Sequence, residues 1–202
     1  MKLYSSWSPN PQKVHFALEE LGLTKQIVEI ELFRGEQRSE SFTALNPMQK
    51  VPVLEDNGFV LWESNAILAY LGERENRLWP TDGRARADAL RWMFFEARHL
   101  AESIGALWFF ESIAPTVGVP PDTEAISRGR KELEHPMTVI EKRLSTRAWI
   151  LGAEFSLVDC CIGTQLAALT ASQFDWTAYS ASKSYVAKIR ERNGWRATNP
   201  RY

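Results

Sequence analysis

The sequence predicts an α/β N-terminal domain, in which helices cover a mixed four-stranded sheet, followed by an all-helical C-terminal domain. Three observations predict this fold class. Short apolar runs alternate with helical patterns over residues 1–76. The Asp-Asn-Gly sequence at residues 56–58 is a strong hairpin turn between two strand patterns. Over residues 85–202 strand patterns are scarce and apolar residues recur at helical spacing. The polar segment 77–84 is the predicted linker.

The N-terminal elements are predicted in the order β-α-β-α-β-β-α. We expect strands over residues 2–6, 27–32, 51–54 and 59–62. The first helix carries an apolar repeat from Val14 to Leu21 and ends at Gly22, and Ser64 caps the third helix. A short helical turn over residues 39–45 lies between them. A strand-helix-strand unit followed by a helix and a hairpin gives a mixed sheet covered by helices.

Three apolar stripes at helical spacing predict the helices of the second domain. One long helix spans residues 90–108, a second spans 133–144 with Pro136 near a kink, and a third spans 158–169. We expect residues 115–121 to form a loop, and residues 185–192 to form a last short helix before a polar tail.

The composition is that of an ordinary soluble protein and excludes several functional classes. The 202 residues are 45% hydrophobic and 24% charged, with a net charge of −1, so neither a nucleic acid nor a membrane is an expected partner. The N-terminus does not resemble a signal peptide, and no apolar run is long enough to span a bilayer. Cys160 and Cys161 are adjacent and make a poor disulfide framework, so we expect a cytoplasmic location. The histidines show no metal-ligand spacing, and no metal is expected.

The segment Lys50-Val51-Pro52 is the first candidate binding element. Pro52 opens a predicted strand, where it cannot donate to the ladder. A cis Val51–Pro52 bond would turn the main-chain N–H and C=O of Val51 outward at the sheet edge, where an extended peptide could pair with them. The alternative is a trans proline that only begins a strand, which is the commoner state of such a bond.

The pair Glu63 and Ser64 is the second candidate. A helix N-terminus attracts a carboxylate, and Ser64 adds a hydroxyl at that position. Glu63 beside it can pair with an ammonium, so together they suit the α-amino-acid end of a γ-glutamyl group. The alternative is a plain N-cap beside a solvated glutamate.

The third candidate is the loop after the first strand, which contains Ser8-Pro9-Asn10. Its hydroxyls and amides precede a helix and can donate to an anion. No cysteine lies in this segment, so sulfur chemistry here must use a thiol brought by the substrate. The alternative role of these residues is helix capping alone.

In this order and spacing, the three elements resemble the N-terminal domain of the cytosolic glutathione transferases. The Phe155–Asp159 segment resembles the capping box and hydrophobic staple of the family's helical domain, so the likeness covers about residues 1–195. It implies a thioredoxin-like domain over residues 1–76, a helical domain over 85–202, and glutathione as co-substrate. The implied activity is attack of the glutathione thiolate on a small hydrophobic electrophile, as in detoxification.

The resemblance also implies roles for individual residues around glutathione. The main chain of Val51, next to Pro52, pairs with the cysteinyl backbone. Glu63 and Ser64 hold the γ-glutamyl group. The residues implied near the glycyl carboxylate are Lys50 and Gln37, and many relatives have histidine where Gln37 stands.

Ser8 and Asn10 are the implied catalytic residues. In the serine-using theta and phi classes the catalytic serine lies six residues before a helical valine, and that spacing from Val14 leads to Ser8. The Nu-like bacterial class has a Thr-Pro-Asn run, which Ser8-Pro9-Asn10 resembles. Tyr4 is an alternative, since the alpha, mu and pi classes use a tyrosine after the first strand, and Ser5 and Ser6 are minor candidates.

The aromatic residues suggest where the second substrate binds. Trp7, Trp108, Phe109 and Phe110 are candidate walls of its pocket, although aromatic residues at helical spacing are more often core. The resemblance further implies a homodimer built around the helices that hold residues 64–74 and 85–112.

Two other functions compete with the transferase hypothesis. One is a glutathione-dependent disulfide or peroxide reductase of the Nu-like kind, which the Ser8-Pro9-Asn10 run favours. The other is a non-catalytic binding protein that keeps the fold. The intact Val51-Pro52 and Glu63-Ser64 pairs argue against the latter, because a protein that no longer binds glutathione does not need them.

Overall fold

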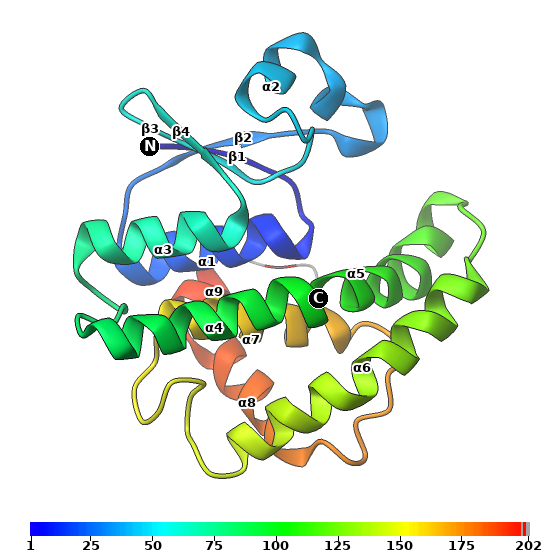
Figure 1. Cartoon of the computed structure of the whole chain (residues 1–202). Coiled ribbons are helices and arrows are strands. Elements are labelled where there is room, and N and C mark those ends of the chain that lie inside the picture. Colours follow the sequence, from blue (N-terminus) through cyan, green and yellow to red (C-terminus); the bar gives the residue numbers. More distant parts are fainter. Residues whose placement is uncertain (199, 201–202) are drawn as a thin grey trace.

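A computed structural model describes residues 1–198 and 200 of the chain (Figure 1). Its sheet has the strand order β2-β1-β3-β4, with strands β1 (Lys2–Ser5), β2 (Gln26–Glu29), β3 (Val53–Asp56) and β4 (Phe59–Trp62). β1 is parallel to β2 and antiparallel to β3, which is antiparallel to β4. The predicted mixed four-stranded sheet is therefore confirmed.

Helices cover both faces of the sheet. α1 (Pro9–Leu21) and α3 (Ser64–Glu75) lie between the sheet and the helical domain, and the short α2 (Glu40–Leu45) lies on the other face (Figure 1). Because side chains alternate along β1, Leu3 is buried in the main core, whereas Tyr4 packs with Phe42 on the α2 side. Gly22 ends α1 in the left-handed conformation, as predicted.

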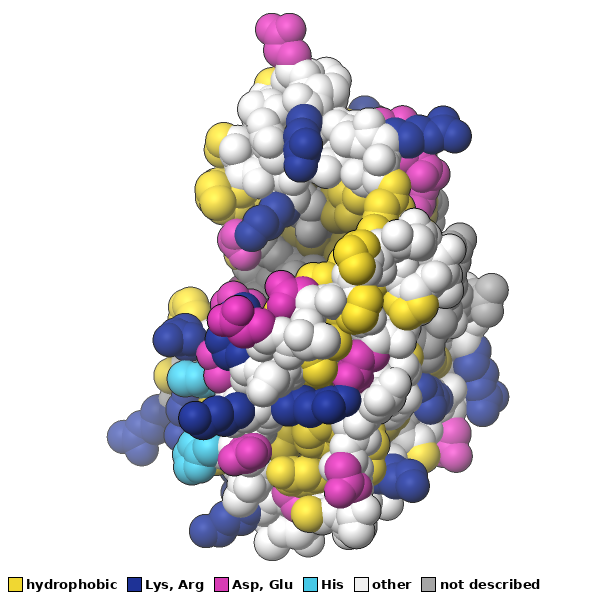
Figure 2. All heavy atoms as spheres, turned by 90° about the vertical axis from the view of Figure 1, so that its right-hand side faces the viewer, with side chains coloured by type: hydrophobic (Ala, Val, Ile, Leu, Met, Phe, Trp, Pro, Cys, Tyr) yellow, Lys and Arg dark blue, Asp and Glu magenta, His cyan; other side chains and the backbone are white. Residues whose placement is uncertain are grey.

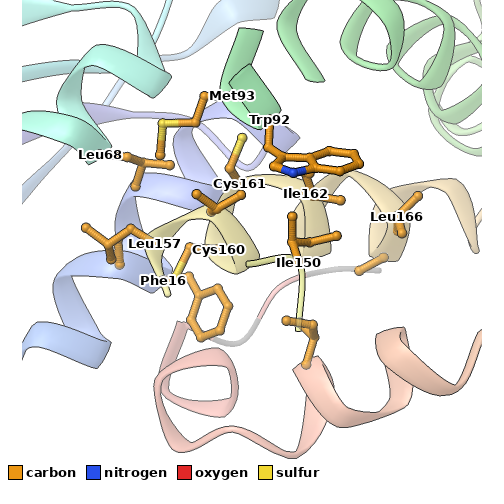
Figure 3. Close-up of a cluster of buried hydrophobic side chains, with 14 of the residues drawn as sticks. Phe16, Leu68, Trp92, Met93, Ile150, Leu157, Cys160, Cys161, Ile162 and Leu166 are labelled. Atoms are coloured by element: carbon orange, nitrogen blue, oxygen red, sulfur yellow. The ribbon is translucent and has the colours of Figure 1, made fainter. Parts of the chain in front are cut away.

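The second domain is all-helical around a buried central helix. Its elements are α4 (Gly83–His99), α5 (Ala101–Trp108), α6 (Thr123–Leu144), α7 (Leu157–Leu169), α8 (Ser180–Glu191) and α9 (Asn193–Thr198), with a π-helical turn at Phe109–Ile113 and a 3₁₀ turn at Ala114–Val117 between α5 and α6. Every residue of α7 is buried. Figure 3 shows the core in which Cys160 and Cys161 of α7 meet Phe16 of α1, Leu68 of α3 and Met93 of α4. The two domains thus share one continuous core.

The long helix predicted over residues 90–108 is broken in the structure. It divides at Leu100 into α4 and α5. Leu90 and Ala97, which belong to the predicted apolar stripe, are exposed. Both line a cavity beside α3 instead of facing the core. An apolar repeat marks a helix face, but it does not say whether that face meets the core or a groove.

Other boundaries also differ from the predictions: α6 begins ten residues earlier than predicted, at Thr123, and α8 five residues earlier, at Ser180. β2 ends at Glu29 rather than residue 32, because the chain turns into a 3₁₀ segment that Gly35 closes with a φ of 78°. β3 begins at Val53, after the Val51–Pro52 bond. The predicted polar tail contains α9, whose Trp195 packs its ring edge-on against Phe16 of α1. Residues 199, 201 and 202 of that tail lie outside the described residues.

Over residues 1–198 and 200, no helix is both long and apolar enough to cross a bilayer. Within the same part of the chain, no group of three or more His, Cys, Asp or Glu side chains could hold a metal ion.

Candidate functional site

Ser8 lies at the N-terminus of α1 with a side chain that its own helix does not use. Its backbone is extended, with φ −81° and ψ 162°, and the hydroxyl makes no capping hydrogen bond. The Ser8 Oγ lies 2.9 Å from Ser6 Oγ. Because Pro9 and Pro11 have no N–H, the free main-chain donor in the first turn of α1 is the N–H of Asn10. The hydroxyl of Ser8 and the amides of Asn10 are therefore the donors that this helix end offers.

The N-terminus of α3 is also open. Glu63 links β4 to α3 with a φ of 70° and a ψ of 108°, a conformation that costs energy for a non-glycine residue and that clusters at functional sites. Glu63 occupies the N-cap position and Ser64 is the first helical residue, so the prediction that Ser64 caps the helix is wrong by one position. The Glu63 side chain makes no capping hydrogen bond either. The first amides of α3 therefore remain available to an anion.

One cavity brings the two helix ends together. It has a volume of about 680 Å³ and lies among α1, α3 and α4. Asn10, Glu63 and Ser64 contribute to its wall, together with the apolar side chains of Leu90 and Phe94 on α4. Asn10 and the Glu63–Ser64 pair, about 55 positions apart in the sequence, thus line one cavity, whereas Ser8 is not among its lining residues.

A buried ion pair that the sequence analysis missed lies behind this cavity. Lys13 Nζ is 2.9 Å from Glu96 Oε1, and the two side chains are 1% and 0% exposed. Burial alone would lower the pKa of the Lys13 ammonium, but the Glu96 carboxylate holds that pKa above its ordinary value. Asn65 of α3 joins the pair, donating from Nδ2 to Glu96 Oε2 at 2.7 Å. The available signal was a charged residue inside each apolar stripe, Lys13 next to Val14 and Glu96 three residues after Met93.

The residues expected near the rest of glutathione do not line that cavity. The Val51–Pro52 bond is cis. Over the described residues, neither the N–H nor the C=O of Val51 makes a hydrogen bond. Lys50 has an exposed side chain, and its carbonyl accepts from Asn46 Nδ2 at 2.6 Å. Gln37 lies in the 3₁₀ segment Glu36–Arg38, and its buried Oε1 has no partner among the described residues.

The aromatic residues predicted to contact the second substrate lie where the two domains meet, and none of them lines the cavity described above. Trp7 and Trp108 have ring centroids 5.3 Å apart, which joins the loop before α1 to the end of α5. Phe109 follows in the π-helical turn, with its ring centroid 5.1 Å from that of Phe110. Phe33, which the sequence analysis did not select, stacks on Trp7 and is 56% exposed. Figure 2 shows hydrophobic side chains gathered along this junction.

The other candidates for the catalytic residue, Tyr4 and Ser5, make hydrogen bonds elsewhere in the protein. The Tyr4 hydroxyl donates to Glu55 at 2.9 Å on the α2 side of the sheet. Burial and that hydrogen bond raise the pKa of Tyr4. Ser5 Oγ donates to the carbonyl of Ser6. Cys160 and Cys161 are fully buried, and burial raises the pKa of both thiols well above its ordinary value.

Comparison with known proteins identifies the family of this fold. The thioredoxin-like domain matches the family model of the glutathione S-transferase N-terminal domain over residues 1–73, and the helical domain matches that of the C-terminal domain over residues 123–202. The disulfide-bond oxidoreductase YfcG of Escherichia coli K12 is 30% identical over 94% of this chain and 90% of its own length. The chain belongs to the glutathione S-transferase family of enzymes.

Two further similar proteins are connected with glutathione, one by its name and one by its crystal structure. The rat (Rattus norvegicus) protein named glutathione S-transferase theta-2 is 31% identical over 79% of this chain and 67% of its own length. A glutathione transferase of Burkholderia graminis, 26% identical, superposes with a TM-score of 0.85 over 97% of this chain and 85% of the other. The crystal structure of the Burkholderia protein holds two glutathione molecules per subunit.

Proposed function

We propose that this protein is a cytoplasmic glutathione transferase, which binds glutathione as the thiolate and directs it at a small hydrophobic electrophile. The observation that carries the proposal is the cavity wall that joins Asn10 at the start of α1 with Glu63 and Ser64 at the start of α3. Two open helix ends supply donors for two anionic groups of one ligand, its sulfur and its carboxylate.

The γ-glutamyl end binds at α3. Its carboxylate accepts from the amides of the first turn and from the Ser64 hydroxyl, and its ammonium pairs with Glu63. The unpartnered N–H and C=O of Val51 pair with the cysteinyl main chain, as an added strand does. Lys50 and Gln37 take the glycyl carboxylate.

The thiol is activated by hydrogen-bond donors. A free thiol has a pKa near 8.5, so little thiolate exists at neutral pH. The Ser8 hydroxyl and the Asn10 amide stabilise the charged form, and a pKa lowered by roughly 2 units corresponds to about 2.7 kcal/mol in favour of the thiolate. The serine hydroxyl acts only as a donor, because it is too weak a base to remove the proton, which passes to solvent.

The thiolate then attacks an electrophilic carbon of the second substrate. A carbon–sulfur bond forms, and the leaving group departs with its electron pair. Trp7, Trp108 and Phe109 supply the apolar wall against which this substrate packs.

A disulfide reductase is the second candidate function. The name of the Escherichia coli relative and the Ser8-Pro9-Asn10 run favour it. Both cysteines of the chain are buried, so two glutathione molecules must supply the thiols. The first thiolate attacks the disulfide and releases one thiolate, and the second attacks the resulting mixed disulfide to give oxidised glutathione and the other thiol.

One set of assays tests both candidates. Glutathione binding is measured by calorimetry, followed by turnover with chlorodinitrobenzene and with hydroxyethyl disulfide. Faster turnover of the first acceptor supports the transferase, and faster turnover of the second supports the reductase. Ser64→Ala is expected to weaken binding about ten-fold, a loss of about 1.4 kcal/mol. Ser184→Ala, at an exposed position of α8, is the control. Binding without either activity would indicate a non-catalytic binding protein.

We also propose that the α3–α4 face forms a homodimer. Phe94 and Leu90 of α4 are 72% and 39% exposed beside the cavity, and exposed apolar side chains that lie together are typical of interaction surfaces. Phe94→Lys is expected to give a monomer in sedimentation velocity. Val117→Lys, an exposed apolar residue beyond α5, is the control and leaves the dimer intact. A wild-type monomer contradicts the proposal.

A further inference from the structure

Gln165 on α7 lies directly behind Asn10 and touches both domains. Its side chain is 1% exposed. The Gln165 Nε2 donates to Asn10 Oδ1 at 3.0 Å and to Glu96 Oε1 at 2.8 Å. Both hydrogens of this NH₂ group are therefore used, one toward the helical domain and one toward the start of α1.

Glu96 fixes which end of the Gln165 amide faces it. Four donors surround the Glu96 carboxylate. Lys13 and Gln165 donate to Oε1, and Asn65 and Cys161 donate to Oε2 at 2.7 and 3.3 Å. A carboxylate only accepts hydrogen bonds, so Gln165 must present its NH₂ group to it.

The Glu96 carboxylate excludes the reverse orientation of the Gln165 amide. Gln165 Oε1 is buried and has no hydrogen-bond partner among the described residues. Turning the amide over would instead bring this oxygen against the Glu96 carboxylate and would leave Asn10 Oδ1 facing another oxygen. The observed orientation is the one that Glu96 permits.

The orientation of Asn10 follows from that of Gln165. Because Gln165 offers a hydrogen, Asn10 must meet it with its oxygen, and the Asn10 Nδ2 is directed away from Gln165. Over residues 1–198 and 200, nothing accepts a hydrogen bond from Asn10 Nδ2. Two hydrogens of an exposed side chain therefore remain for a ligand at the start of α1.

We propose that Gln165 is a positioning residue, which holds the Asn10 amide so that its NH₂ group faces the glutathione sulfur. The proposal rests on the proposed function for the identity of that ligand. The chain of contacts begins at the buried Lys13–Glu96 pair, so the charged pair acts on the sulfur through two amides and without touching it. Since Asn10 belongs to the sheet domain and Gln165 to the helical domain, the orientation of the donor depends on the contact between the domains.

The test compares Gln165→Met with Thr164→Val. Methionine keeps the length and volume of glutamine and removes both hydrogen bonds. Thr164 is the preceding buried residue of α7, and its hydroxyl has no partner among the described residues, so valine leaves the network intact. Gln165→Met is expected to raise the apparent thiol pKa of bound glutathione by about 0.5 unit or more. This pKa is measured from the absorbance of the thiolate. The substitution should also lower kcat about three-fold while KM for glutathione stays within about two-fold. Thr164→Val should change neither.

A double-mutant cycle separates positioning from a general structural effect. If Gln165 acts through Asn10, then Gln165→Met adds nothing to the thiol pKa in an Asn10→Ala background. Equal shifts in both backgrounds overturn the proposal. Should Gln165→Met fail to fold, Gln165→Asn keeps an amide that is too short to reach both Glu96 and Asn10, and it is expected to give the same pattern.

A measurement without ligand distinguishes this proposal from the proposed function. In the free protein, the side-chain NH₂ signals of Asn10 are assigned by their loss in Asn10→Ala. Gln165→Met should shift them, and Thr164→Val should not. Unchanged signals overturn the positioning role. A wild-type protein that binds no glutathione overturns the proposed function, whatever the Asn10 signals show.

Discussion

Helices α1 and α7 both have a serine at the N-cap, and the two serines make different hydrogen bonds. At the start of α7, Ser156 is buried, and its N–H and hydroxyl both donate to Asp159 Oδ2 at 2.8 Å. At the start of α1, the Ser8 hydroxyl makes no capping hydrogen bond and is partly exposed. Ser156 is part of a capping box, whereas Ser8 is the residue that we propose as a donor to the ligand.

The residue three positions after each serine explains the difference. The Asp159 carboxylate accepts hydrogen bonds from Ser156 and completes a capping box. Pro11 holds the same position in α1, where it has neither an N–H to be capped nor a side chain that can accept. With Pro11 at this position, α1 cannot form the capping box that holds Ser156 in α7.

The largest expected effect comes from removing the Asp159 side chain, which closes the capping box at the start of α7. Asp159 is fully buried and also accepts from the N–H of Ile150 at 2.8 Å and from the hydroxyl of Tyr185 at 2.9 Å. Asp159→Ala leaves these donors buried without a partner, so the free energy of unfolding should fall by about 3 kcal/mol or more, measured by urea denaturation. The folded fraction should still bind glutathione with an unchanged thiol pKa. A loss below about 1 kcal/mol would contradict the structural role.

Removing the Ser8 hydroxyl at the start of α1 should instead lower activity and leave stability almost unchanged. Ser8→Ala removes a donor that the fold does not need, so the free energy of unfolding should stay within about 0.5 kcal/mol of the wild type. The value of kcat/KM should fall ten-fold or more, a cost of about 1.4 kcal/mol in transition-state stabilisation. Ser6→Ala, which removes the hydroxyl beside Ser8, is the comparison variant and should have the smaller effect. Unchanged kinetics in Ser8→Ala would transfer the role to Asn10.

The sequence predicted the features that depend on neighbours along the chain. The four strand segments, the end of α1 at Gly22 and the Ser156–Asp159 box each follow from a short local pattern. The choice of Ser8 and Asn10 as catalytic residues also rests on a local run, and it stays a prediction.

Features that join distant segments could not be predicted in the same way. Lys13, Glu96 and Gln165 come from three helices spread over about 150 residues, and no local pattern marks them as partners. The exposure of Leu90 has the same origin, since the apolar repeat is identical whether a helix faces the core or a groove. α9 lay within a segment too polar to show a clear repeat.

The smallest expected effect comes from giving the start of α1 a main-chain N–H that Ser8 can cap, as at the start of α7. Pro11→Ala restores an N–H at the position that an N-cap serine normally caps, and this N–H should draw the Ser8 oxygen toward the helix. The hydroxyl can still donate, so we expect kcat/KM to fall only about two- to three-fold and the thiol pKa to rise by a few tenths of a unit. Pro9→Ala is the matched control, because it restores an N–H at the first helical position, which the capping side chain does not reach. Equal losses in the two variants would mean that proline packing, and not the missing N–H, keeps Ser8 free.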